Sequence, residues 1–145
     1  MKKDELWYYL KLAEVELYYR DLYLIQQCVH ERTIVHRFAH YLENILVKNK
    51  KLKGFNIDCE YNRNLDGPKR IDVNGTDNYP DMIIHKRGEY DYDLLIAEFK
   101  THWNNDNQTD INKIKEFMES KIYKYQYGVS IIFYENGAEY HWIEI

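Results

Sequence analysis

Residues 79–101 read YPDMIIHKRGEYDYDLLIAEFKT and contain two apolar runs separated by a turn at Gly88. The first run predicts a strand over about 81–87, and the second predicts a strand over about 92–101. Strands that follow each other along the chain after a short connection usually lie side by side in a sheet. Polar side chains at their neighbouring ends would then meet.

Such polar side chains are present at both ends. Asp81 follows a proline at the start of the first strand, and Glu98 and Lys100 close the second strand. Because side chains alternate between the two faces of a strand, Glu98 and Lys100 share one face and Phe99 takes the other. Acids and a lysine inside apolar strands cost free energy unless they pair or hold a metal. Two interpretations stay open: a metal site, or a Glu98–Lys100 ion pair at a strand end with Asp81 in a turn.

The rest of the chain shows helical and strand periodicity in turn. The patterns predict helices over 4–27, 30–48 and 108–119, strands over 55–61, 127–135 and 138–144, and a short strand at 70–73. No clean cap separates the first two helices, so a bent rod and a hairpin both stay open. The order α-α-β-β-β-α-β-β predicts a mixed central sheet flanked by helices, which is an α/β or α+β fold. We expect one domain over residues 1–145, with an N-terminal helical extension over 1–29 and a core over 30–145.

The composition is typical of a soluble globular protein. Charged residues make up 30% of the chain and hydrophobic residues 45%, and no apolar run is long enough to span a bilayer, so no membrane association is expected. Acids interrupt the apolar part of the N-terminal segment, which is not typical of a signal peptide. Cys28 and Cys59 have no pairing pattern, so we expect both to be reduced and buried in a cytoplasmic protein.

Positive charge is clustered although the formal net charge is −4. The clusters consist of Lys48, Lys50, Lys51 and Lys53, then Arg63, Lys69 and Arg70, then Lys86 and Arg87. An acidic chain argues mildly against bulk electrostatic binding of DNA, but the local distribution of charge decides the field at a site. The clusters are therefore either phosphate-binding surfaces or solvated faces.

The arrangement of the two strands resembles the PD-(D/E)xK nuclease superfamily, in which a Pro-Asp at one strand precedes a second strand that ends in E-x-K. The resemblance spans residues 30–133 and implies a restriction-endonuclease-like core. It also implies that Asp81, Glu98 and the backbone carbonyl of Phe99 hold Mg²⁺ or Mn²⁺. Mg²⁺ usually keeps several waters, so one or two carboxylates suffice to bind it. Lys100 would orient the attacking water or stabilise phosphoryl charge, with a pKa lowered by burial near the dication.

Glu31 is a further candidate for the metal and for catalysis. Several members of the superfamily carry a glutamate on the helix that precedes the core strands, and Glu31 occupies the matching place. It stands seven residues before Phe38, so the helical pattern puts it on the side that faces the core. The alternatives are a salt bridge to a neighbour such as Arg32 and a favourable charge at a helix N-terminus.

The segment Glu60–Arg63, followed by Lys69, also resembles stretches in uncharacterised prokaryotic proteins of this superfamily. The resemblance implies that Glu60 is an extra acid of the metal site and that Arg63 and Lys69 hold phosphates. Lys50 and Lys51, in the lysine-rich cluster, are expected to contact the nucleic-acid backbone as well. Surface ion pairs are the alternative for each of these residues.

Other motifs add little. His36 and His40 have the spacing of a zinc pair, but no Cys or further His supports it, so packed or solvent-facing histidines are favoured. Phosphate-loop, dinucleotide-binding and serine-hydrolase motifs are missing from the sequence.

The sequence therefore predicts a small Mg²⁺- or Mn²⁺-dependent nuclease that hydrolyses phosphodiester bonds, with DNA as the expected substrate. The alternative is a non-catalytic nucleic-acid-binding or protein-interaction module that keeps the nuclease fold. The acid–acid–lysine set favours the enzyme. The acidic pI of 5.9 and the lack of an added DNA-reading domain favour the module, or an enzyme that works as a homodimer or with a partner subunit.

Overall fold

The residues that the structure describes form three helices, a short 3₁₀ turn and seven strands. A computed structural model describes residues 1–61, 63–64, 67–68, 79–89, 91 and 93–145, with the backbone alone for 63–64 and 67–68. The helices are α1 (Lys3–Gln26), α2 (Glu31–Leu46) and α3 (Gln108–Glu119), and the 3₁₀ turn is η1 (Lys50–Leu52). The strands are β1 (Asn56–Cys59), β2 (Arg63–Asn64), β3 (Gly67–Pro68), β4 (Met82–His85), β5 (Leu95–Thr101), β6 (Tyr127–Tyr134) and β7 (Gly137–Ile143).

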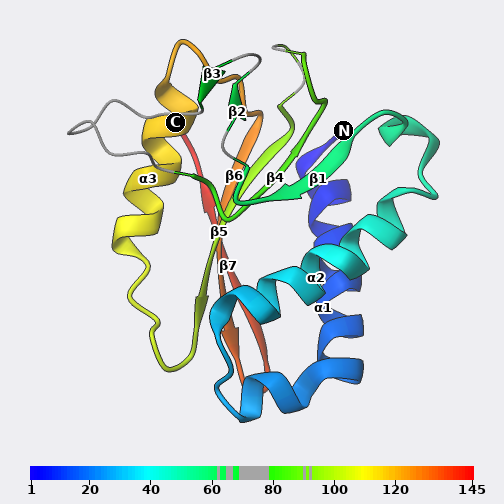
Figure 1. Cartoon of the computed structure of the whole chain (residues 1–145), viewed down its shortest axis with the longest axis vertical. Coiled ribbons are helices and arrows are strands. Elements are labelled where there is room, and N and C mark those ends of the chain that lie inside the picture. Colours follow the sequence, from blue (N-terminus) through cyan, green and yellow to red (C-terminus); the bar gives the residue numbers. More distant parts are fainter. Residues whose placement is uncertain (62, 65–66, 69–78, 90, 92) are drawn as a thin grey trace.

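Five of these strands form one mixed sheet in the order β1-β4-β5-β6-β7, and β2 pairs with β3 alone. Only β5 and β6 run parallel, and α3 forms the crossover between them (Figure 1). In the antiparallel β4–β5 pair, Met82 lies opposite Ala97. One step beyond this register, Asp81 faces Glu98. The fold is thus α+β with a mixed sheet, as the order of elements predicts.

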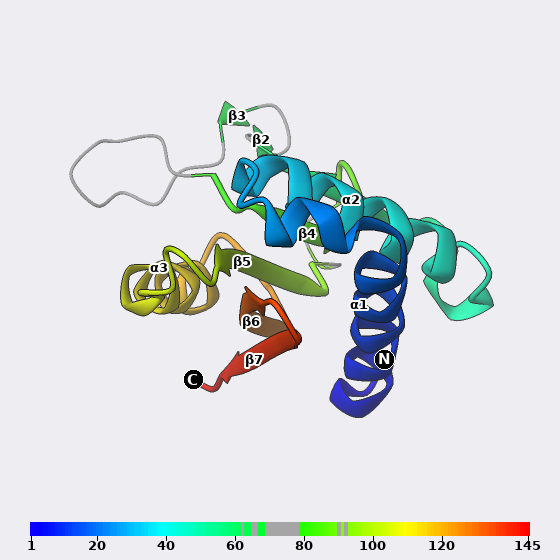
Figure 2. The ribbon, with the colours of Figure 1, turned by 90° about the horizontal axis from the view of Figure 1, so that it is seen from below.

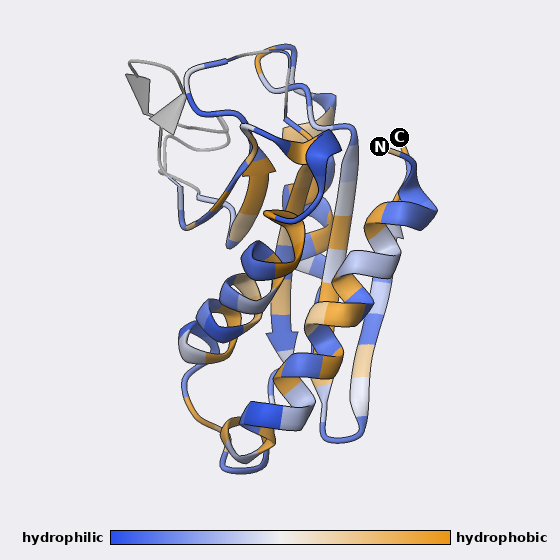
Figure 3. Cartoon of the chain, turned by 90° about the vertical axis from the view of Figure 1, so that its right-hand side faces the viewer, coloured by the Kyte–Doolittle hydropathy of each residue, from blue (hydrophilic) through white to orange (hydrophobic). Residues whose placement is uncertain are grey.

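Helices cover both faces of the sheet. Figure 2 shows α3 on one side and the α1–α2 pair on the other. The α1–α2 side holds the larger core, in which the Phe38 ring of α2 packs at a steep angle against Phe99 and Phe133, with ring centroids 5.5 and 5.6 Å away. The α3 side holds a smaller core around Ile96 and Ile114. Orange and blue segments alternate along the helices in Figure 3, as expected for helices with one face against a core.

The junction between the first two helices is a tight hairpin. The chain leaves α1 through Cys28, whose φ of 51° lies in the left-handed region, and α2 begins three residues later. Near its end α1 bends at Asp21, whose carboxylate accepts hydrogen bonds from Arg37 and Tyr41 of α2. The hairpin alternative is therefore correct, and a bent rod is wrong.

Two sequence expectations fail or fall outside the described residues. Cys28 and Cys59 are both exposed, so the prediction that they are buried is wrong; Cys28 lies in the turn after α1 and Cys59 at the end of an edge strand. The short strand predicted at 70–73 lies outside the described residues. In the part of the chain that the structure describes, no helix has the length and apolarity needed to cross a membrane.

Truncating Phe38 should weaken the packing of α2 against the sheet and destabilise the fold. The side chain is fully buried and touches two other phenylalanines, so Phe38→Ala should lower the free energy of unfolding by about 3–5 kcal/mol. Urea unfolding followed by circular dichroism measures this. The control is Tyr19→Ala, because Tyr19 is 83% exposed on α1 and its loss should change stability by less than about 0.5 kcal/mol. Equal effects of the two changes would contradict the packing described here.

An ion-pair cluster holds the edge strand β1 to β4. The Asp58 carboxylate accepts hydrogen bonds from Arg87 and from His85, whose Nε2 lies 2.8 Å away. Burial raises the pKa of Asp58, but these two partners outweigh burial and hold it well below its usual range. Folding therefore favours the ionised form. This stabilisation is complete above about pH 4 and is lost as the pH falls through the folded-state pKa.

The variant Asp58→Asn should accordingly be less stable than the unmodified chain at pH 7. The difference in unfolding free energy between the two proteins should shrink when the same urea titrations are repeated near pH 2.5. A difference that stays constant across this range would show that the Asp58 charge contributes nothing to stability.

Candidate active site

Asp81 and Glu98 are neighbours at the end of the β4–β5 pair. The Asp81 amide donates to Glu98 Oε1 at 3.1 Å, and the amide of Phe99 donates to Asp81 Oδ2 at 2.9 Å. Hydrogen bonds from backbone amides to these two carboxylates thus hold the strands together beyond the last backbone pair. Since Glu98 and Lys100 follow Ile96 at intervals of two, all three point to the α3 side, while Phe99 points into the larger core.

Lys113 of α3 forms an ion pair with the carboxylate of Glu98. Its Nζ lies 2.9 Å from Oε1 and 3.0 Å from Oε2, and it also donates to the carbonyl of Tyr79 at 2.5 Å. Glu98 is 2% exposed, so this pair is shielded from water. Burial and the nearby Asp81 raise the pKa of Glu98 well above its usual range, against the pull of Lys113. Lys113 therefore fixes the rotamer of the central acid.

Lys100 points at a different acid of the same helix. Its Nζ is 3.5 Å from Oδ2 of Asp110, one turn before Lys113 on α3. Burial lowers the pKa of Lys100, but Asp110 and Glu31 raise it by more, so the net shift is upward. The lowered pKa expected from the sequence concerns the metal-bound protein and stays a prediction, because without a metal the neighbouring acids outweigh burial.

Glu31 belongs to this cluster through its charge. It is the first residue of α2 and is half-buried. Burial, followed by the charge of Asp81, raises the pKa of Glu31 to about 7, while Lys100 acts in the opposite direction. Burial also raises the pKa of Asp110, with a further contribution from Asp81. Several acids therefore lie near one another in a region that is partly shielded from water, and they repel one another when ionised.

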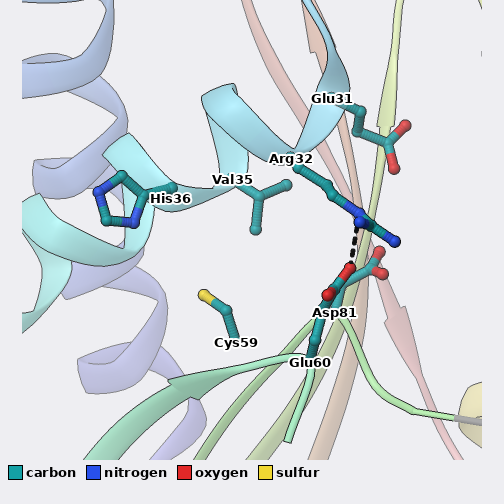
Figure 4. Close-up of a pocket in the computed structure, with 7 residues that line it drawn as sticks. All are labelled: Glu31, Arg32, Val35, His36, Cys59, Glu60 and Asp81. Atoms are coloured by element: carbon teal, nitrogen blue, oxygen red, sulfur yellow. Dashed lines mark ion pairs between the residues drawn. The ribbon is translucent and has the colours of Figure 1, made fainter.

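A pocket of about 150 Å³ opens between α2 and the end of β1, beside these acids. Figure 4 shows Glu31 and Asp81 on one side of it, and Cys59 of β1 opposite Val35 and His36 of α2. Arg32, which is exposed, pairs with Glu60 across the mouth at 2.8 Å. The prediction of a surface ion pair is thus confirmed for Glu60, and the prediction that Glu60 is an extra acid of the metal site has no support. Glu31 does not pair with Arg32. It does lie in the first turn of α2, which agrees with the alternative of a charge at a helix N-terminus.

The donor set suits a hard divalent cation. Within the described residues, no group of three or more His, Cys, Asp or Glu side chains lies close enough together to hold a metal ion by itself. Mg²⁺ does not need one, because it binds through one or two carboxylates and retains water. Asp110 Oδ2 is buried without a hydrogen bond of good geometry, and the pKa values of Glu31, Glu98 and Asp110 are all raised. Burial is the main cause of these shifts and the neighbouring acids add to it, and a bound cation would offset both effects, so the chemistry of these residues fits a metal.

The other predicted residues lie away from the cluster or outside the description. Lys50 and Lys51 belong to η1, after the opposite end of α2, and Lys51 pairs with Glu5 of α1 at 3.2 Å. Arg63 lies in β2, where the backbone alone is described, and Lys69 lies outside the described residues. His36 and His40 are exposed, as the sequence favours.

Three charged residues of the site escape sequence reasoning: Arg32, Asp110 and Lys113. Asp110 is an acid in the first turn of α3, which by itself indicates only a favourable charge at a helix N-terminus. The signal that could identify the two α3 residues is their spacing of three on the helix that follows the E-x-K strand, since this spacing puts both on one face. Arg32 follows Glu31 directly and carries no separate signal.

Comparisons of the chain with known proteins give no match. No protein-family model matches the chain, and neither a curated protein nor a solved structure gives a significant match. The functional argument therefore depends on the site itself.

Proposed function

We propose that this chain is a metal-dependent nuclease with a restriction-endonuclease-like core, and that it hydrolyses phosphodiester bonds in nucleic acid, with DNA as the first substrate to test. One observation carries the proposal. Asp81 and Glu98 are hydrogen-bonded neighbours at the end of two central strands, and Glu31, Asp110 and Lys100 surround them. Buried acids that raise one another's pKa are typical of sites that bind a cation or move protons.

Each residue of the candidate active site would have its own role in phosphodiester hydrolysis. Asp81 and Glu98 would hold Mg²⁺ or Mn²⁺, with Glu31 as a further acid and the Phe99 carbonyl as a further oxygen donor. The metal supplies charge neutralisation and an acidified water for attack on phosphorus. Lys100 would stabilise charge on the phosphoryl oxygens, and its positive charge is secured by Asp110. Arg32, at the mouth of the pocket, would exchange Glu60 for a backbone phosphate.

Incubation with labelled single-stranded, double-stranded and branched DNA, and with RNA, tests this function. Cleavage should require Mg²⁺ or Mn²⁺ and should stop on addition of EDTA. The Asp81→Asn protein, purified in parallel, should be inactive, which excludes a contaminating nuclease. Absence of metal-dependent cleavage on every substrate would refute the proposal.

A second candidate is a nucleic-acid-binding module without catalysis. The Lys113–Glu98 ion pair favours it, because Lys113 engages both carboxylate oxygens and Glu98 is almost completely buried. In this module the pair would be a permanent structural contact. Metal-independent binding of nucleic acid with no cleavage would support this candidate over the enzyme.

A further inference from the structure

A second pocket lies between α2 and β1, on the same seam as the first pocket, which Glu31 and Asp81 line. It has a volume of about 400 Å³ and is formed by the end of α2, the η1 turn and the start of β1. Ile57 lines this pocket and Cys59 lines the first one, so both pockets lie on the same face of β1. Along α2, the lining positions are 31, 32, 35 and 36 for the first pocket, and 43, 46 and the following position 47 for the second.

The second pocket has an apolar interior and a charged rim. Ile57, Ile84 and Phe55 provide apolar surface, and the half-buried Phe55 ring carries Lys86 Nζ 5.3 Å from its centroid. Lys50 and Lys53, both exposed, stand at the rim. This combination matches the two halves of a nucleotide, because an apolar pocket with an aromatic wall accepts a base and lysines accept its phosphates.

Charge on this rim also favours an anion. Glu43 is the one acid among the lining residues, whereas the lining contains two lysines and Lys86 lies beside Phe55. Asn49 is already engaged, since its side chain bonds to Tyr9 and to the amide of Lys51. The pocket therefore keeps a net positive rim beside an apolar interior.

We propose that the second pocket binds one unstacked nucleotide of a single-stranded nucleic acid whose chain runs along the α2–β1 seam to Asp81. The inference rests on the proposed nuclease function and names its substrate class. A base inside a duplex is stacked and paired, so it cannot enter such a pocket. Both single-stranded DNA and single-stranded RNA have the chemistry required.

The length of the seam sets the number of nucleotides. The centres of the two sets of lining positions are about twelve residues apart along α2, which is about 18 Å at 1.5 Å per residue. At about 3.4 Å per stacked nucleotide, a strand of about five nucleotides spans this distance. A trinucleotide is therefore too short to reach both pockets, and an octanucleotide is long enough.

Fluorescence anisotropy with labelled oligonucleotides in EDTA tests the inference without cleavage. The unmodified protein should bind an eight-nucleotide DNA or RNA strand at least about tenfold more tightly than a three-nucleotide strand, and more tightly than an eight-base-pair duplex. Changing Lys50→Ala and Lys53→Ala together should weaken binding of the longer strand by about tenfold. The salt slope should fall by about 1.4, since two phosphate contacts are lost at about 0.7 each.

The matched control changes Lys115→Ala and Lys121→Ala together, because both lysines are exposed on or just after α3, away from the seam. It removes the same charge and should leave affinity and salt slope unchanged. A scan of single abasic positions through the octanucleotide should show one position at which loss of the base weakens binding to the unmodified protein but not to the Lys50/Lys53 double variant.

The outcomes separate the two proposals. If the Lys50/Lys53 double variant binds both octanucleotides like the unmodified protein, the pocket proposal falls even if cleavage is observed. If no strand is cleaved with any metal but the length dependence and the lysine effect are present, the pocket stands and the nuclease function falls. Equal affinity for duplex and single strand would also overturn the pocket proposal.

Discussion

Replacing Lys100 with alanine should reduce the single-turnover rate of metal-dependent cleavage by a factor of about 10² to 10³. This is the range found when one preorganised electrostatic contact to a developing charge is removed. Lys100 sits on the same strand face as Glu98, and its Nζ lies 3.5 Å from Asp110 Oδ2, so its ammonium group lies beside the acids of the site. Affinity for Mn²⁺ and for nucleic acid should change far less, because Lys100 is not a metal ligand.

The matched control for this change is Lys115→Ala, since Lys115 is exposed on α3 and its loss alters net charge equally. It should leave the rate within about twofold, as a rate loss there would indicate bulk charge as the cause. Quenched-flow or manual single-turnover assays at saturating protein measure both variants. A Lys100→Ala protein that cleaves at the unmodified rate would remove Lys100 from the mechanism.

The change Glu98→Gln should lose metal binding and cleavage together. The glutamine keeps the size of the side chain and one oxygen for the amide of Asp81 and for Lys113, so folding should be preserved. Loss of a direct ligand should weaken Mn²⁺ binding by more than about 100-fold, the upper range for loss of an outer partner alone. Isothermal titration with Mn²⁺ measures the affinity, and thermal unfolding confirms that the variant is folded.

Asp81→Asn should behave in the same way, because the two carboxylates face each other across the end of the strand pair. In contrast, Glu60→Gln should leave Mn²⁺ affinity unchanged, since Glu60 pairs with Arg32 at the pocket mouth. A Glu98→Gln protein that binds Mn²⁺ like the unmodified chain would place the metal elsewhere or exclude it.

The strand ends of the site could be predicted from the sequence because they depend on local pattern. Apolar runs on either side of Gly88 define β4 and β5, and alternation along β5 puts Glu98 and Lys100 on one face. The residues of α3 could be placed in a helix for the same reason, since its bounds match the predicted 108–119.

The partners of these residues could not be predicted, because they depend on how separate elements pack. Lys113 reaches Glu98 only because α3 crosses the sheet at that point, and nothing near Glu98 in the sequence indicates it. The lysine-rich segment shows the same limit. Lys50 and Lys51 are adjacent in the sequence, but Lys50 lines the second pocket, whereas Lys51 pairs with Glu5.

A crystal of the protein soaked in Mn²⁺ tests the central claim most directly. Anomalous diffraction should show a Mn²⁺ ion bound by the carboxylates of Asp81 and Glu98, with the Glu98–Lys113 ion pair loosened to free an oxygen. Crystals of Asp81→Asn, soaked identically, should show no ion at this position. Full soaking with no anomalous peak near these acids, and with Lys113 still on both oxygens of Glu98, would contradict the proposal that this site is a metal-dependent nuclease centre.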